Sequence, residues 1–269
     1  MFQKSGIRSL SIPGIKYIQS YAFAETAISG ELVIPASFAG MSSYNASYAF
    51  KGCTEITSVI LEGVDGSQTS ASIGTGAFED CSKLRSVVIG EGFVSGGQNT
   101  FKNCVLLDSI DLPSTLTSFY DRVFENTGFT EFVFPATVKT HAPYLFSGCT
   151  KLQRVEFAEG TTQIGGYGPP GGTNMFQGCT ALTEVVFPST MTSLVGNMFN
   201  AASGYEKPTN IKKLILPANM TSVDASAFVG LAEDCQVYCR GSESVLAPLW
   251  SSGWDAPLTL PVIWDYTGN

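Results

Sequence analysis

The sequence predicts a solenoid, a right-handed coil of about nine to ten stacked repeats with one short parallel strand in each repeat. Phenylalanines recur at intervals of 22 to 30 residues, and a short apolar stripe follows each of them at a nearly fixed distance. A period of roughly 20 to 30 residues is typical of units that bury their apolar faces only against their neighbours. The anchor phenylalanines are Phe23, Phe50, Phe78, Phe101, Phe124, Phe146, Phe176, Phe199 and Phe228.

The end of each repeat predicts the strand. The stretch from Phe78 to Ile89 reads F-x-x-C-x-x-L-x-x-V-x-I, and the same register follows Phe101, Phe146 and Phe176. Its last three positions alternate with period two, are rich in Val, Ile and Phe, and often precede proline, which favours a short strand. Short helical or 3-10 turns and loops are expected on the other side of the coil. Ten strands are predicted, centred near Ser11, Val33, Ile60, Val88, Asp111, Val133, Glu156, Val186, Ile215 and Tyr238.

This pattern resembles the BspA-like leucine-rich repeat family of the treponemal type, in which F-x-x-C-x-x-L-x-x-I-x-L-P is the recurring unit. The resemblance covers residues 7–240, with Thr26 and Thr127 as departures at the cysteine position and an insertion at 201–210. It implies a leucine-rich repeat solenoid over residues 1–240, closed by a cap at 241–269. The cap contains Trp250, Trp254 and Trp264, which are expected to seal the last repeat.

Composition indicates which classes of partner and which cellular location to expect. Charged residues make up 14% of the chain, the formal charge is −8 and no basic run exists, so a nucleic-acid partner is not predicted. No apolar run is long enough to insert into a membrane. The chain is expected to be extracellular or displayed on the cell surface. Because its first repeat lacks a beginning and no signal peptide precedes it, we expect a piece of a longer protein.

Seven cysteines are present, and most of them occupy one position of the repeat. We expect buried structural thiols at Cys53, Cys81, Cys104, Cys149 and Cys179. Stacked neighbours at about 5 Å leave bridging open on distance alone, and a bridge involving Cys235 or Cys239 is also open. With His141 as the single histidine and no C-x-x-C pair, no metal site is predicted.

No catalytic constellation or cofactor site is predicted. The segment 166–171 formally matches the phosphate-binding pattern G-x-G-x-x-G, but Pro169 and Pro170 oppose the helix that this pattern requires. His141 has no nucleophile at a recognised spacing. We therefore expect the chain not to be an enzyme.

The exposed strand face is the first candidate site. Alternation along a strand turns the central residue outward, which gives an apolar column interrupted by Asp111 and Glu156. Such a column can mark an interaction surface, or it can reflect the preference of β-branched residues for a pleated sheet. The adjacent column alternates in charge on successive strands, which predicts a self-satisfied ladder with Arg154 as a possible anchor for a partner. The candidate protein-binding face is Val33, Ile60, Val88, Val133, Arg154, Val186, Ile215 and Tyr238.

Loops and the cap supply further candidates. Tyr44, Tyr48, Tyr167 and Tyr205 lie in or beside insertions, where they could contact a protein or a sugar, or only cover their own loops. Trp250 and Trp254 could alternatively form a platform for a glycan.

These observations together predict a non-catalytic binding protein. The family resemblance implies adhesion to host or matrix proteins, or to other cells. The alternative is a carbohydrate-binding module or structural spacer within a larger surface protein.

Overall fold

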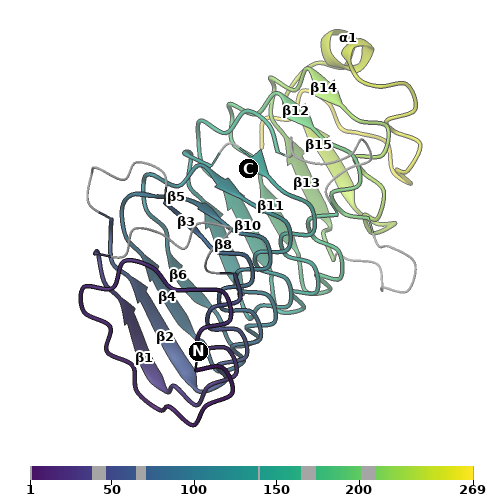
Figure 1. Cartoon of the computed structure of the whole chain (residues 1–269). Coiled ribbons are helices and arrows are strands. Elements are labelled where there is room, and N and C mark those ends of the chain that lie inside the picture. Colours follow the sequence, from purple (N-terminus) through teal and green to yellow (C-terminus); the bar gives the residue numbers. More distant parts are fainter. Residues whose placement is uncertain are drawn as a thin grey trace. The chain divides into compact units, whose positions relative to one another are not determined.

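The repeats form stacked turns in the computed structural model, which describes residues 2–37, 47–64, 71–138, 140–164, 174–200 and 210–268. The chain divides into unit 1, Met1–Phe129, and unit 2, Thr130–Asn269, and each is described by itself. In both units most turns contribute a strand to a parallel row (Figure 1). The predicted parallel-strand solenoid is therefore confirmed, whereas the boundary predicted at residue 240 lies inside unit 2 and stays a prediction.

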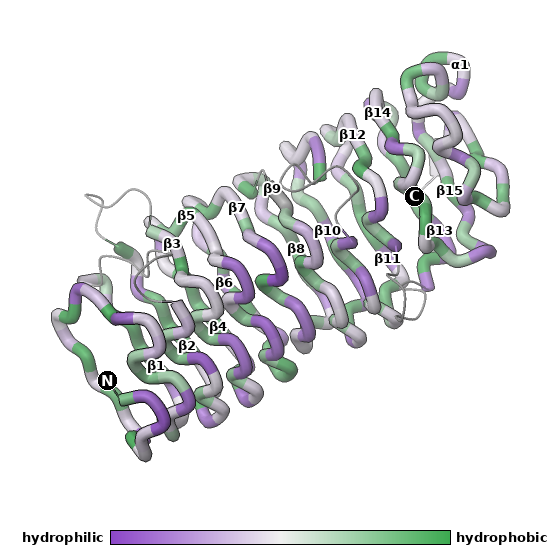
Figure 2. The backbone as a smooth tube through the Cα atoms, turned by 45° about the vertical axis from the view of Figure 1, so that its right-hand side comes forward, coloured by the Kyte–Doolittle hydropathy of each residue, from purple (hydrophilic) through white to green (hydrophobic). Residues whose placement is uncertain are grey.

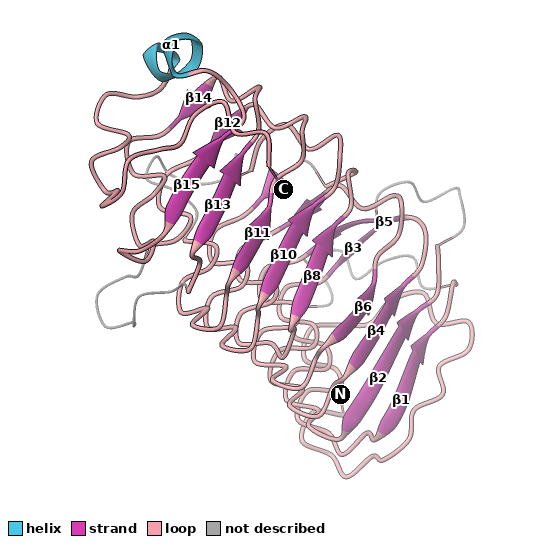
Figure 3. Ribbon diagram, turned by 180° about the vertical axis from the view of Figure 1, so that it is seen from behind, coloured by secondary structure: helices cyan, strands magenta, loops and turns pink. Residues whose placement is uncertain are grey.

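Unit 1 contains two rows of parallel strands. The main sheet has the order β1 (Gly30–Ile34), β2 (Ile56–Leu61), β4 (Ser86–Ile89) and β6 (Ser109–Asp111), which lie side by side in Figure 3. A second row, which the sequence did not predict, consists of β3 (Ala71–Ile73), β5 (Phe93–Gly96) and β7 (Ser118–Phe119). Strands of two to four residues are too short to leave a readable period.

The strand predicted near Ser11 is absent, and this prediction was wrong. Residues 7–12 have no strand assignment. A single backbone hydrogen bond, from the Ser29 N–H to the Arg8 carbonyl at 3.0 Å, joins them to the next turn. These residues form the outermost described turn of unit 1, so they can pair on one side only.

Unit 2 repeats this arrangement. Its strand face contains β8 (Glu131–Phe134), β10 (Arg154–Phe157) and β11 (Glu184–Val186) in one sheet and β13 (Lys213–Leu216) with β15 (Gln236–Cys239) in another. Shorter strands are β9 (Thr140–His141), β12 (Ser193–Leu194) and β14 (Ser222–Val223), of which the last two pair. Hydrophobic and hydrophilic segments alternate along each turn in both units, as the solenoid pattern requires (Figure 2).

Stacked phenylalanine rings form the core of each unit. In unit 1 successive ring centroids lie 5.4 to 6.0 Å apart with planes within 8° of parallel. In unit 2 the Phe146, Phe176 and Phe199 rings stack at 6.2 and 6.0 Å. The unit 1 stack comprises Phe2, Phe23, Phe50, Phe78, Phe101 and Phe124. Phe2 was missed as an anchor because Ser5 and Arg8 stand where cysteine and leucine follow the other anchors.

The backbone around each phenylalanine bonds to the next turn. Around Phe101, the N–H groups of Asn99, Phe101 and Asn103 donate to carbonyls of the following turn at 2.9, 3.0 and 2.8 Å. Asn99 and Asn103 have φ angles of 58° and 63°. Asparagine and glycine tolerate this left-handed conformation best, which explains their frequency two residues before and after the anchors. Between these residues, backbone N–H groups donate to carbonyls three residues earlier in the chain, as in a 3-10 turn.

The cysteines are structural, as predicted. All seven are buried and unbridged, so the bridge considered for Cys235 and Cys239 does not form. The Cys81 thiol donates to the Phe50 carbonyl of the preceding turn at 3.3 Å, and Cys104 donates to Phe78 at 3.2 Å. Thr26 differs, since its hydroxyl donates to the Phe23 carbonyl of its own turn at 2.9 Å. Burial raises the pKa of the Cys53, Cys81 and Cys104 thiols, and it raises that of Cys235 to about 11.

The chain after β15 covers the end of unit 2. Helix α1 (Glu243–Leu246) and the 3-10 helix η1 (Ala247–Leu249) are followed by a segment that returns to β15. There the Cys239 N–H donates to the Ile263 carbonyl at 2.8 Å, so the free edge of β15 is paired. Within the described ranges, no helix has the length and apolar character needed to cross a lipid bilayer.

Candidate functional site

The main sheet of unit 1 exposes the apolar column that the sequence predicted. Val33, Ile60 and Val88 are register partners on β1, β2 and β4, and we call them the unit 1 patch. Val33 and Val88 are 38% and 39% exposed, whereas the alternate residues Val59 and Val87 are buried. The outward direction of these residues is therefore as predicted. Asp111 continues the column on β6 and ends its apolar part.

In unit 2 the same column is shorter, because charges interrupt it. Val133 is 54% exposed, but Glu156 is its partner on β10 and separates it from Val186. The Arg154 guanidinium forms ion pairs with the Glu156 carboxylate at 2.6 Å and with the Glu184 carboxylate at 2.9 Å. The hydrogen bond from Arg154 to Glu156 raises the pKa of the guanidinium. Arg154 is thus part of a satisfied charge cluster, and a partner that used it would compete with two carboxylates.

A groove opens between β11 and β13 that the sequence did not predict. The two strands belong to different sheets, and among the described residues no backbone hydrogen bond joins one strand to the other. A cavity of about 820 Å³ fills the opening. The signal for it was present, since the insertion at 201–210 lies between these two strands in the sequence. We call this cavity the β11–β13 groove.

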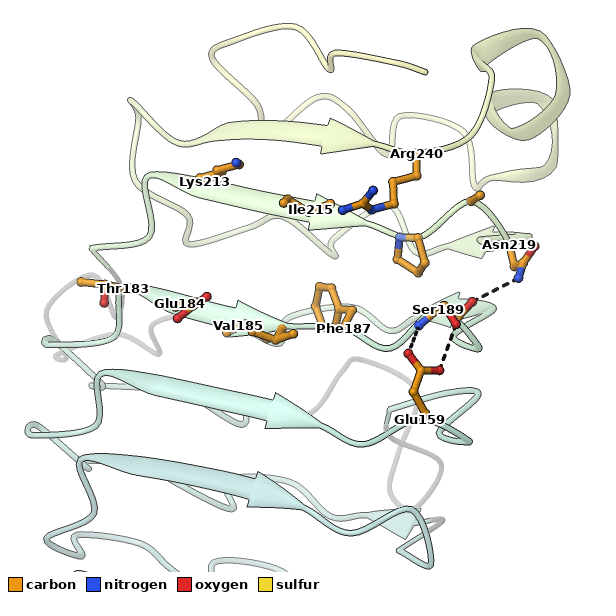
Figure 4. Close-up of a pocket in the computed structure, with 13 residues that line it drawn as sticks. Glu159, Thr183, Glu184, Val185, Phe187, Ser189, Lys213, Ile215, Asn219 and Arg240 are labelled. Atoms are coloured by element: carbon orange, nitrogen blue, oxygen red, sulfur yellow. Dashed lines mark hydrogen bonds between the residues drawn. The ribbon is translucent and has the colours of Figure 1, made fainter. Parts of the chain in front are cut away.

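The groove has an apolar centre and polar ends. Val186, Phe187 and Ile215 are among its lining residues, and Figure 4 shows Phe187 and Ile215 at the space between the two strands. Glu184 and Lys213 lie where the strands begin. Of the predicted face residues, Val186 and Ile215 therefore come together here. The remaining predicted residues of unit 2 lie outside the lining of the groove.

Hydrogen bonds fix the opposite end of the groove. Glu159 accepts from the Ser189 backbone N–H and hydroxyl, both at 2.9 Å, and these bonds lower the pKa of its carboxyl. Asn219 donates to the Ser189 carbonyl at 3.1 Å, as the dashed lines of Figure 4 show. Arg240 lies above this end and donates to the Gly268 carbonyl at 2.9 Å. The groove is therefore a preformed recess for apolar groups with fixed polar groups around it.

The cation at the other end is also held in place. Lys213 donates to the Tyr266 hydroxyl at 2.8 Å, and its ammonium lies 5.3 Å from the Tyr238 ring centroid. The Tyr238 ring packs against the Tyr266 ring at 4.4 Å between centroids, with the planes tilted by 47°. The outward face of Tyr238 is consequently shared with the returning C-terminal segment.

The predicted loop tyrosines have different outcomes. Tyr44, Tyr167 and Tyr205 lie outside the described residues. Tyr48 is described, and its ring stacks on Tyr21 at 5.0 Å and occupies the space beside Gly76 where a Cβ would clash. The Tyr48 side chain therefore packs against its own neighbouring turns.

The predicted glycan platform needs a correction at Trp250. This side chain is only 6% exposed, and its indole N–H donates to the Met220 carbonyl at 2.7 Å. It packs against Trp254 at 4.7 Å and Trp264 at 5.2 Å between ring centroids. Trp250 thus has no open face for a sugar, because it is the buried anchor of the cap, whereas Trp254 and Trp264 stay partly exposed.

Solved structures with a similar fold are bacterial leucine-rich repeat proteins. One from Bacteroides ovatus matches with a TM-score of 0.59 and 20% identity, covering 96% of this chain and 63% of that one. The chain thus spans less than two thirds of that relative. A leucine-rich repeat protein of T. pallidum matches with a TM-score of 0.50 and 23% identity, covering 65% of this chain and 78% of that one. A comparison with curated protein sequences finds no match.

The repeat unit itself identifies the family. The family model for the BspA type leucine rich repeat region matches six copies, at residues 1–63, 44–169, 71–206 and 171–235. These ranges contain every predicted anchor phenylalanine. The chain belongs to the BspA-type leucine-rich repeat family.

Proposed function

We propose that this chain is a surface-displayed, non-catalytic binding protein that adheres to a protein partner through the β11–β13 groove of unit 2. Proteins of its family are generally binding scaffolds and not enzymes. The partner class is a host or matrix protein, or a protein of another cell. The observation that carries this proposal is the groove itself, a concave apolar recess on an otherwise regular strand face.

The chemistry of the groove suits a protein partner. Protein interfaces combine an apolar, well-packed centre with a polar rim, and large side chains that fill pockets supply most of the binding energy. Phe187 and Ile215 supply such a centre, and Glu159 at one end and Lys213 at the other are already fixed by their own hydrogen bonds. A partner side chain in the groove would therefore displace water from apolar surface without breaking those bonds.

The groove alone is too small for a stable complex. A standard interface buries about 800 Å² on each partner, so adjoining strand surface has to contribute. On β8, Val133 is the most exposed apolar residue of the strand face of unit 2, and Val186 continues its column into the groove. The unit 1 patch offers a second surface of the same chemistry, and we include it as a separate contact region.

The experiment compares two variants that carry the same valine-to-lysine substitution at different places. Val186→Lys places a charge in the groove, whereas Val105→Lys makes the same change at an exposed valine in a turn of unit 1. Wild type and both variants are passed over immobilised matrix proteins in a surface plasmon resonance panel, with a glycan array in parallel. Circular dichroism confirms that each variant is folded.

Each outcome decides between functions. Saturable protein binding that Val186→Lys abolishes and Val105→Lys preserves supports the proposal. Protein binding that both variants retain would place the site elsewhere on the chain. Glycan binding without protein binding favours the carbohydrate-binding alternative, and silence in both panels favours a structural spacer.

A further inference from the structure

A second, smaller pocket lies in the cap, away from the strand face. It has a volume of about 300 Å³, and Trp254, Trp264, Glu243 and Asp255 contribute to its lining. Leu258 and Val262 complete its apolar wall. We call it the cap pocket. The β11–β13 groove shares no lining residue with it.

Two tryptophan rings meet at a right angle in the cap pocket. The Trp254 and Trp264 centroids lie 5.9 Å apart with an interplanar angle of 84°. Behind them, the buried Trp250 contacts both rings and is held by its hydrogen bond to Met220. Phe228 of the last repeat supports Trp254 from the side at 6.1 Å. The corner is therefore rigid before any ligand arrives.

The charges of the cap pocket are all of one sign. Glu243 and Asp255 bring two carboxylates, and no lysine or arginine is among the lining residues. Neither carboxylate forms a salt bridge or side-chain hydrogen bond with another described residue. Glu159 in the β11–β13 groove differs, because Ser189 donates two hydrogen bonds to it. The cap pocket thus combines aromatic faces with negative charge that the described chain leaves without a counter-charge.

We propose that the cap pocket binds an organic cation, an alkylammonium group of the kind carried by a lysine side chain or a quaternary amine. The face of an indole ring carries negative electrostatic potential, and rings at an angle to each other form the walls of aromatic cages for ammonium groups. The two carboxylates add Coulomb attraction at the mouth of the pocket. A neutral sugar could stack on one indole and donate its hydroxyls to the carboxylates, but it would not neutralise their two negative charges, whereas an ammonium group would reduce that net charge.

The placement of the tryptophans provides a direct assay. All three tryptophans of the chain are in this cap, so tryptophan fluorescence, excited selectively over tyrosine, reports on the cap that contains the pocket. The purified chain is titrated with tetramethylammonium chloride, with Nα-acetyl-lysine methylamide and with neopentyl alcohol, a neutral analogue of similar shape. Ionic strength is held constant with sodium chloride. We expect a saturable fluorescence change with an ammonium compound and none with the alcohol.

Substitutions test the contribution of charge without removing the aromatic walls. Glu243 and Asp255 are exposed, so Glu243→Gln and Asp255→Asn should each weaken ammonium binding about 1.5- to fivefold, the range that exposed charge pairs give. Asp108→Asn, an exposed acid in unit 1, is the matched control and should leave binding unchanged. Trp264→Leu should abolish saturation, with folding checked by circular dichroism.

The two ammonium probes distinguish the source of the cation. Tighter binding of the lysine derivative indicates a basic protein segment, and tighter binding of tetramethylammonium indicates a quaternary amine. An equal response to neopentyl alcohol, or ammonium binding unaffected by both carboxylate substitutions, would overturn the proposal. So would the absence of a saturable response to either ammonium compound. Val186→Lys should not alter this titration, so failure here is distinguishable from failure of the groove.

Discussion

Removing one ring from the phenylalanine stack of unit 1 should show how much the stack stabilises the fold. The Phe101 ring is 1% exposed and lies between Phe78 at 5.8 Å and Phe124 at 6.0 Å. Phe101→Ala leaves a cavity where both neighbouring rings lose a stacking partner. Substitutions of this kind in a packed core lower the free energy of unfolding by about 3–5 kcal/mol. We expect a loss within this range.

Phe2 offers the matched control, because it is the outer member of the same stack. Its side chain is 52% exposed and stacks on one ring only, Phe23 at 5.6 Å. Half of the transfer free energy of a phenylalanine plus one aromatic contact comes to about 1–3 kcal/mol. Phe2→Ala should therefore lower the free energy of unfolding by roughly half as much as Phe101→Ala, or less.

Urea unfolding followed by far-ultraviolet circular dichroism measures both variants against wild type. The comparison uses equilibrium midpoints and slopes, because repeat proteins can unfold in parts and a change of slope would reveal this. Equal losses for Phe101→Ala and Phe2→Ala would refute the reasoning, since burial and the number of stacked neighbours would then not determine the contribution of a ring.

Three further predictions concern the polar contacts between turns. The pKa of the Glu91 carboxyl is lowered mainly because the Ser114 backbone N–H donates to it, so its contribution to stability is present above the usual glutamate pKa and is lost on acidification through the lowered value. Thermal unfolding should show Glu91→Gln less stable than wild type at neutral pH, with a difference that shrinks in acid; a constant difference would contradict this. The Cys81 and Cys104 thiols should resist a disulfide reagent at about pH 8 until urea is added, because burial raises their pKa values. Finally, Cys81→Thr should be more stable than the isosteric Cys81→Val by about 0.5–1.5 kcal/mol in urea, since only the hydroxyl can donate to a phenylalanine carbonyl.

Much of the fold could be predicted because the same residue pattern recurs in successive repeats. The register from Phe78 to Ile89 recurs, so the strand positions of β2, β4 and β10 followed from one alignment. The prediction of a strand near Ser11 failed because a strand needs neighbouring strands to pair with along its edges, and a local sequence pattern does not report them. The short second row, such as β7 with two residues, has no period of its own.

The candidate site was predictable only in part. The alternation of side chains along a strand correctly predicted that Val33 and Val88 are exposed, because this alternation depends only on the strand itself. The β11–β13 groove depends on how two strands separate after an insertion, and the sequence marked the insertion without indicating its effect. The burial of Trp250 likewise depends on where the C-terminal segment returns, which composition alone does not determine.

The stack of phenylalanine turns has a consequence for how such a chain can evolve. The backbone N–H groups of each turn donate to carbonyls of the next turn, and its phenylalanine ring stacks only on the rings of the adjacent turns, as around Phe101. A gene segment that encodes one whole turn can therefore be duplicated or deleted without requiring compensating changes elsewhere in the stack. Threonine at the cysteine position, as in Thr26, bonds within its own turn and needs no predecessor. A cysteine at this position bonds to the preceding turn instead, as Cys81 does to Phe50, so it ties its own turn to its neighbour.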